Sequence, residues 1–291
     1  MIESLTLLEQ HPLWLTGIAG LLGLVVGSFL NVVIYRLPLI MEREWQEQCA
    51  EYLECPDKKP EGNAITLSRP GSHCPHCGHE IRPWENIPVL SFLIQMGRCS
   101  QCREKISWRY PAIESLSAVL SLALAWQLGF GWPLLFGLFF LWALLALTFI
   151  DLDKQLLPDQ ITLPLLWLGI ILSFFNIYTP LAMSVIGAIA GYLVLWSVYW
   201  GFKLLTGKEG MGYGDFKLLA ALGAWFGWQA LPLLILLASI SGAVFGLAFI
   251  LFFQHDRRQP IPFGPYLAFA GWVMLMWGQS LMFYYQQWLR F

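Results

Sequence analysis

The chain has 291 residues, of which 57% are hydrophobic and only 12% are charged. An ordinary soluble domain carries about 25% charged residues. The low charge and a mean hydropathy of +0.59 therefore exclude such a domain and predict a membrane protein. The net charge of −2 says nothing about nucleic acid, and we expect no nucleic-acid partner.

Five stretches contain no Asp, Glu, Lys or Arg: residues 10–35, 115–150, 160–202, 218–254 and 259–289. A transmembrane helix needs about 20 apolar residues. The first and last stretches can each hold one span, and the three middle ones can each hold two. Glycine and proline near 129–133, 176–180 and 227–232 supply the intervening turns. We predict an all-α polytopic membrane protein with about eight transmembrane helices.

The basic residues fall mainly on one side of this arrangement. With eight spans, the polar segment 37–113 shares a side with the short connections near 151–159, 203–217 and 255–258. Those connections hold six lysines and arginines, whereas the opposite side holds only Arg290. Because such an excess marks the cytoplasmic side, the polar segment is predicted to be cytoplasmic and both termini periplasmic. The start of the chain, with Glu3 and Glu9 and no base, does not resemble a cleaved signal peptide.

This pattern predicts three parts: a first transmembrane helix (1–36), a cytoplasmic insert (37–110) and a seven-helix membrane domain (111–291). Near the end of the first span, Gly27 permits close helix packing and Asn31 needs a partner within the bundle. Arg36 is interpreted as an interface anchor. Residues 42–61 are predicted to form a short acidic surface helix and a linker. We assign no role to Cys49 or Cys55.

Four cysteines of the insert form two Cys-x-x-Cys pairs, Cys74 with Cys77 and Cys99 with Cys102. Two such pairs supply the four thiolates of a closed tetrahedral zinc site, and their separation is close to that of zinc ribbons. A cytoplasmic position disfavours disulfides. We predict one structural zinc ion, whose binding would help this small insert to fold.

Residues 84–91, between the two cysteine pairs, include an apolar part. It is predicted either to dock the insert against the membrane or to pack on the metal core. Just inside the second span, Glu114 is predicted to pair with Arg109 or another interfacial base, with a functional role as the alternative.

Two aspartates stand where an apolar segment meets water: Asp151 closes the third span and Asp215 opens the sixth. Acids so close to hydrocarbon mark pathways or chemistry. Two adjacent carboxylates can share one proton, one accepting from a water and the other donating toward a carbonyl. We therefore predict an aspartic-protease pair. Asp153 and Asp159 are interpreted as solvated or helix-capping residues.

The loop before Asp215 contains four glycines between residues 207 and 214. These glycines permit backbone shapes that other residues cannot adopt and let the chain approach a substrate backbone closely. The lysine and hydroxyl residue that end a phosphate-binding loop are missing, which disfavours nucleotide binding.

Two other functions fit parts of this pattern. A membrane thiol oxidoreductase would use the cysteine pairs and would hold no metal. A proton-coupled transporter would use the two aspartates as a relay, but such acids more often lie at mid-bilayer than at its edge.

The sequence closely resembles the type IV prepilin peptidases, which are intramembrane aspartyl proteases with a Gly-x-Gly-Asp motif. That motif occurs here at residues 212–215, and the two Cys-x-x-Cys pairs also match. Further matches, in the order of the family, are residues 27–38, 85–91, 97–99, 109–111, 151–159 and 261–266.

The resemblance implies a bacterial inner-membrane enzyme that cuts the basic leader from type IV prepilins and type II secretion pseudopilins at the cytoplasmic face. It implies that Asp151 and Asp215 are the catalytic pair. It also implies N-methylation of the new terminal residue, usually phenylalanine, with S-adenosyl-L-methionine as methyl donor. Gly97 belongs to the region that the family ties to methylation.

Overall fold

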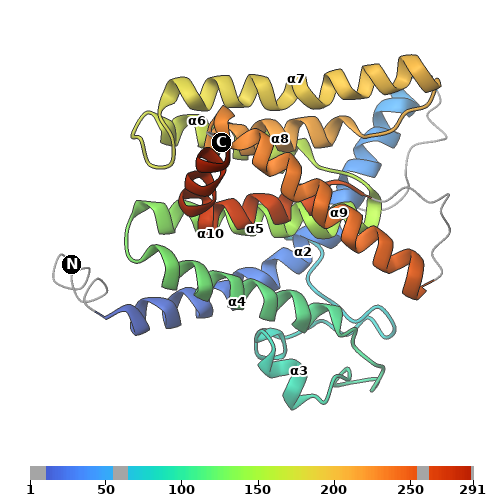
Figure 1. Ribbon diagram of the computed structural model, residues 1–291. Helices are drawn as coiled ribbons and strands as arrows, with labels where there is room; N and C mark the ends of the chain where they lie inside the picture. Colours follow the sequence, from blue (N-terminus) through green and yellow to red (C-terminus); the bar gives the residue numbers. More distant parts are fainter. Residues whose placement is uncertain (1–10, 55–64, 254–261, 290–291) are drawn as a thin grey trace. The chain divides into compact units, whose positions relative to one another are not determined.

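The computed structural model describes residues 11–54, 65–253 and 262–289, and over these residues the chain is helical with two isolated β-bridges and no strand (Figure 1). The chain divides into two compact units, Met1–Phe130 and Gly131–Phe291. Each unit is described by itself. The predicted all-α fold class is confirmed.

The first unit is built on two long helices, α2 (Pro12–Tyr52) and α4 (Arg109–Leu128), which pack against each other. A 3-10 turn, η2 (Pro83–Asn86), and a short helix, α3 (Leu90–Ile94), lie between them in the insert. The packing depends on small residues: a Cβ on Gly23 would meet Ser121 Oγ at 2.7 Å, and one on Gly27 would meet Glu114 Cα at 2.8 Å. The predicted close packing at Gly27 is confirmed.

Helix α2 is longer than the predicted first span. It runs for 41 residues through Pro38, so residues 42–52 continue this helix and are not a separate surface helix as predicted. Asn31 finds its expected partner, donating to the Tyr110 carbonyl at 3.2 Å. Arg36 is buried and donates to loop carbonyls at residues 66 and 67. Cys49 is exposed on α2, and Cys55 lies outside the described residues.

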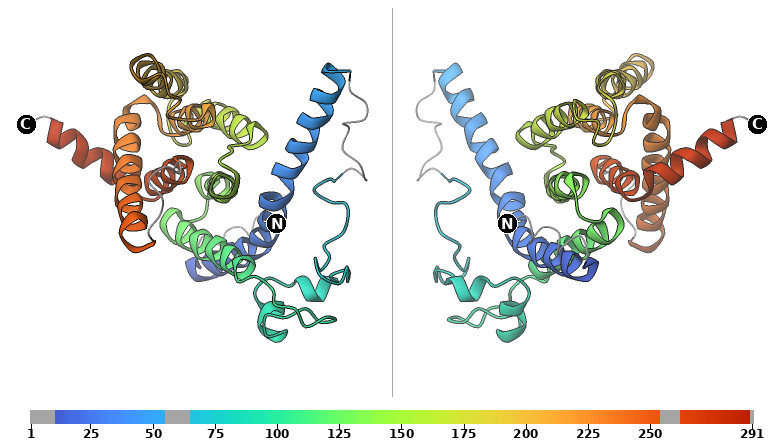
Figure 2. Two further views of the ribbon diagram at one scale, coloured as in Figure 1. Left: turned by 90° about the vertical axis from the view of Figure 1, so that its right-hand side faces the viewer. Right: turned by 90° about the vertical axis from the view of Figure 1, so that its left-hand side faces the viewer.

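The second unit contains six longer helices, and η3 (Trp228–Ala230) precedes the fifth of them. Both views in Figure 2 show α8 enclosed among its neighbours in this unit. The helices are α5 (Trp132–Lys154), α6 (Asp159–Ser173), α7 (Leu181–Thr206), α8 (Tyr213–Phe226), α9 (Leu231–Phe253) and α10 (Gly264–Leu289).

Helix α8 forms the core of the second unit. Its side chains from Leu218 to Trp225 are buried, and it packs against α6, α7 and α10. Glycines allow α7 to approach it closely: a Cβ on Gly187 would lie 2.2 Å from the Gly223 carbonyl oxygen, and one on Gly191 would lie 2.7 Å from the Leu219 oxygen. This Gly-x-x-x-Gly surface is typical of helix contacts in membranes.

The predicted number of about eight spans is confirmed only in part by helix length. Six described helices are long and apolar enough to cross a membrane: α2, α4, α5, α7, α10 and the segment Trp228–Ala248, which includes much of α9. Helices α6 and α8 have 15 and 14 residues. At 1.5 Å per residue they reach only about 21–23 Å, short of a hydrocarbon core of about 30 Å. All eight predicted segments are helical, but eight full spans are not confirmed.

The compact units also divide the chain differently from the predicted parts. The predicted first helix and insert share a unit with α4, because α2 packs along α4, and the division falls after Phe130. The proposed division of functions among 1–36, 37–110 and 111–291 remains a prediction.

Candidate active site and metal centre

Asp151 lies in the last turn of α5 and is only 5% exposed. Its Oδ2 accepts a hydrogen bond of 3.1 Å from the backbone N–H of Gly264, the first residue of α10. A Cβ on Gly264 would lie 2.6 Å from that same oxygen. Glycine at this position therefore lets the backbone of α10 approach the carboxyl group.

Asp215 is the third residue of α8 and is 7% exposed. Phe140 of α5 and Trp225 of α8 pack with their ring centroids 4.4 Å apart. Asp151 follows Phe140 along α5, and Asp215 precedes Trp225 along α8 by nearly the same helical distance, about 15–17 Å. Because α5 and α8 run in opposite directions (Figure 1), the two aspartates lie at the same end of the helix pair, and their carboxyl groups are near enough to interact electrostatically.

Leu157, in the connection from α5 to α6, packs against Gly214, which precedes Asp215, and against Gly264, which binds Asp151. It is 7% exposed. A Cβ on Gly214 would meet Leu157 Cβ at 2.8 Å, and one on Gly264 would meet Leu157 Cδ2 at 3.0 Å. The second glycine of the Gly-x-Gly-Asp motif is thus required for close packing, whereas a Cβ on Gly212 would meet no atom nearer than 3.8 Å.

Asp159 forms an ion pair and does not cap a helix. It is the first residue of α6, whose N-cap is Pro158 and has no side-chain capping hydrogen bond. Lys217 Nζ donates to both Asp159 carboxylate oxygens at 2.7 Å. The pair joins the start of α6 to the first turns of α8. Sequence reasoning missed this pair, because nothing in the spacing links residues 58 apart.

The glycine-rich loop before Asp215 is held to the end of α7. Lys203 donates to Glu209 at 2.8 Å and to the Tyr199 hydroxyl at 3.2 Å. Of its four glycines only Gly207 has a positive φ, +71°, where it ends α7. The left-handed backbone conformation that glycine permits therefore occurs at only one of the four glycines in this loop.

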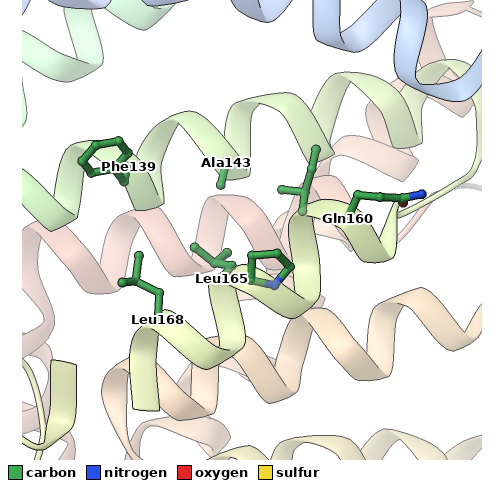
Figure 3. Close-up of a pocket in the computed structure, with 7 residues that line it drawn as sticks. Phe139, Ala143, Gln160, Leu165 and Leu168 are labelled. Carbon is green, nitrogen blue, oxygen red and sulfur yellow. The ribbon is translucent and has the colours of Figure 1, made fainter. Parts of the chain in front are cut away.

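Two pockets of the second unit are lined by residues other than these aspartates. A pocket of about 240 Å³ between α5 and α6 is lined almost wholly by apolar side chains, including Phe139, Ala143 and Leu168 (Figure 3). A second pocket of about 180 Å³ is lined by Tyr199, Phe202 and the glycine-rich loop. Neither aspartate lines either pocket.

The four predicted metal ligands come together in the first unit. The Sγ atoms of Cys74, Cys77, Cys99 and Cys102 all lie within 4.8 Å of one another. Cys74 and Cys102 sulfurs are 3.8 Å apart, and Cys77 and Cys99 sulfurs are 4.0 Å apart. Tetrahedral zinc with Zn–S bonds of about 2.3 Å requires sulfurs about 3.8 Å apart. The donor set and its spacing fit such an ion.

Local backbone geometry favours thiolates at this centre. Backbone N–H groups of Cys77 and His76 lower the pKa of Cys74 to about 7. The N–H of Glu104 favours the Cys102 thiolate, but burial and three neighbouring sulfurs outweigh it and raise the pKa of that thiol to about 12. Four sulfurs this close cannot all be anionic unless a cation balances them.

The histidines beside the first knuckle have other partners. His79 Nε2 lies 3.1 Å from Glu85 Oε2, and His73 Nδ1 lies 3.0 Å from the Gly71 carbonyl oxygen. Hydrogen bonds from Ser100, the Arg82 backbone and His79 lower the pKa of Glu85 to about 2. The cysteines therefore remain the candidate ligand set.

Gly97 lies between α3 and the second knuckle with φ +67°. Its N–H donates to the Phe92 carbonyl and its carbonyl accepts from Ile106 N–H, both at 2.8 Å. A Cβ there would lie 2.9 Å from the Phe92 ring. This geometry explains why glycine is needed, and it gives no contact for a methyl donor.

Glu114 connects the insert to α4. It is 8% exposed, and its Oε2 accepts the Val89 backbone N–H at 2.8 Å. Sequence reasoning expected a basic side chain as its partner and missed this backbone N–H, because a carboxylate near a helix start does not indicate which loop it will contact.

The chain was compared with known proteins. The family model for the bacterial peptidase A24 N-terminal domain matches residues 21–128, and that for the type IV leader peptidase family matches residues 138–247. A prepilin leader peptidase/N-methyltransferase of Aeromonas salmonicida (strain A449) is 58% identical over 266 residues, 91% of each chain.

The chain belongs to the type IV leader peptidase family. Two more relatives with the same name support this: one from Stutzerimonas stutzeri, 54% identical over 97% of this chain and 98% of its own, and one from Pseudomonas aeruginosa, 52% identical over 98% of both. Among solved structures, none matches this chain. Family membership and six membrane-spanning candidates identify a multi-pass inner-membrane protein.

Proposed function

We propose that this protein removes the basic leader from type IV prepilins and type II secretion pseudopilins and then N-methylates the new terminal residue. The observation that carries the peptidase activity is the buried pair Asp151 and Asp215 at a common end of α5 and α8. Curated relatives that align over nearly the whole chain are named for both activities.

The two aspartates are proposed as the catalytic pair. One carboxylate accepts a proton from a water that attacks the scissile carbonyl, and the other carboxyl group donates a proton toward the carbonyl oxygen. Gly264 N–H and Leu157 hold Asp151 in place from α10 and the α5–α6 connection. This step needs no metal.

A hydrophobic substrate helix with a basic leader suits this location. Both aspartates lie next to apolar helix interior, so a scissile bond between an apolar helix and a basic leader would arrive at their depth. Six lysines and arginines in the short connections support a cytoplasmic position for the ends of α5 and α8 that carry the aspartates, with both termini periplasmic.

The four cysteines are proposed to hold one structural zinc ion, which supplies folding energy to the insert when it binds. We propose S-adenosyl-L-methionine as the methyl donor and place Gly97 in the methylation region by resemblance alone. The tight packing of Gly97 on Phe92 supports a structural contribution to that region.

The test is incubation of the purified enzyme with a prepilin-like peptide, followed by mass spectrometry. Loss of the leader mass without donor, and a further methyl mass with S-adenosyl-L-methionine, are expected. The Asp151→Ala and Asp215→Ala double variant should cleave nothing. Its matched control, Asp153→Ala, removes an acid from the same helix end and should retain cleavage. Activity in the double variant would overturn the assignment.

A further inference from the structure

The insert carries an uncharged, apolar surface that the metal centre does not use. Residues 87–97 contain no charged side chain. Leu90, Leu93 and Ile94 have the i, i+3, i+4 spacing that places side chains on one face of a helix, here α3. They are 57%, 59% and 78% exposed. Met96, in the turn that follows, is 82% exposed. These four residues are the α3 apolar face.

The opposite side of α3 is fully used by the insert itself. Phe92 is 8% exposed and packs edge-on against Trp108 with ring centroids 4.6 Å apart. It also fills the space above Gly97. One aromatic residue thus anchors α3 to the metal-binding fold, and the apolar side chains on the other face have no role in that core.

The depth of α3 is set by its tether to α4. Val89, which immediately precedes α3, donates its N–H to Glu114, the sixth residue of a candidate membrane span. At 1.5 Å per residue Glu114 lies about 8 Å along the helix from its start. Figures 1 and 2 both show α3 beside the first turns of α4.

Residues around the tether have the composition of a membrane interface. Trp108 and Tyr110, at the start of α4, are 73% and 47% exposed, and such aromatic rings favour the headgroup level. The bases Arg98, Arg103 and Lys105 are exposed on the following knuckle and suit phosphate headgroups.

We propose that the α3 apolar face inserts into the lipid interface and anchors the metal-binding insert on the membrane surface. Interfacial helices bury their apolar side about 5–10 Å into the boundary between headgroups and acyl chains. The depth fixed by Glu114 falls in that range. The lipid bilayer is chosen over a protein partner because the tether places this face beside a membrane span at that depth.

Site-directed spin labelling tests the proposal on the full chain in lipid nanodiscs of phosphatidylcholine and phosphatidylglycerol. Cys49 and Cys55 are replaced by serine, and retained zinc and absence of label on this background show that the four ligand cysteines are protected. Ile94→Cys is then labelled. Val119→Cys, in the middle of α4 and 62% exposed, is the lipid reference. Glu51→Cys, exposed near the end of α2, is the water reference.

Accessibility to oxygen and to a water-soluble nickel chelate separates the outcomes. The expected result is an oxygen-to-nickel ratio at Ile94 that is several-fold above that at Glu51 and close to that at Val119. Nickel access equal to that at Glu51 would overturn the proposal in favour of a solvated face. Low access to both reagents would overturn it in favour of a protein cover, from this chain or a second copy.

A second variant checks that the tether sets the depth. Glu114→Ala removes the acceptor of the Val89 N–H, so the label at Ile94 should become several-fold more accessible to nickel. Zinc content, measured on the same sample, should not change. An unaltered nickel accessibility would mean that Glu114 does not fix the depth of α3, which contradicts that step of the inference.

Discussion

The metal centre and the aspartate pair are assembled over very different distances along the chain. The four cysteines lie between residues 74 and 102, on two knuckles whose own backbone N–H groups favour thiolates. The aspartates are 64 positions apart, and Asp151 is held by Gly264, a further 49 positions beyond Asp215. The candidate metal centre therefore depends on local turns, whereas the aspartate pair depends on the packing of α5, α8 and α10.

The largest expected effect tests whether leader cleavage, and not methylation, depends on the aspartates of the second unit. Asp151→Asn or Asp215→Asn should reduce leader cleavage by about 10³-fold or more, because general acid–base catalysis contributes about 10²–10⁴-fold per group. Methylation of a peptide that already lacks its leader should persist. Quantitative mass spectrometry measures both, and loss of methylation as well would show that the two activities share these residues.

Metal removal addresses the first unit. Cys74→Ser with Cys102→Ser should abolish binding of the single zinc ion and methylation, because the insert loses the folding energy of its metal. Cleavage should fall much less, since the aspartates belong to a separate compact unit. Elemental analysis and the two peptide assays check this, with Cys49→Ser as the control. Equal loss of both activities would contradict the independence of the two units.

A smaller effect is expected from backbone crowding at the aspartates. Gly264→Ala should lower cleavage by about 10²-fold, the typical consequence of a displacement of about 1 Å at a catalytic group, because its methyl group would overlap Asp151 Oδ2. Gly214→Ala, which would crowd Leu157, should act in the same direction. Gly212→Ala is the matched control and should retain cleavage, because its Cβ has room. Equal losses at all three glycines would refute the packing argument.

The smallest effect is expected at the ion pair that joins α6 and α8. Both side chains of the Asp159–Lys217 pair are partly exposed, 48% and 30%. Such pairs contribute about 0–1 kcal/mol. Lys217→Gln should therefore change the thermal unfolding temperature in detergent only slightly, and Lys217→Arg should restore it. Glu47→Gln, in the exposed pair with Arg43, is the control. A large loss of stability would show that the packing of α8 depends on this charge pair.

Sequence reasoning located the candidate metal ligands because Cys-x-x-Cys spacing is itself the geometry of a knuckle. It located both aspartates because each lies at the edge of a long uncharged run. It missed the contacts of Gly264 with Asp151 and with Leu157, because apolar side chains and glycines at helix starts occur in any helical bundle. It did not show that two of the predicted spans form helices of only 14 and 15 residues, since an uncharged run does not reveal how many of its residues lie in turns.

The amino-acid sequence alone determined the helical membrane class, the order of the helices and the four-cysteine ligand set, because hydropathy and local spacing are properties of neighbouring residues. Only the tertiary structure decided that α8 is a short buried core helix and that Gly264 donates to Asp151. It also decided that Glu114 holds the insert through Val89. These features depend on contacts between distant segments, where glycines set the approach of one backbone to another, and no local pattern encodes such an approach.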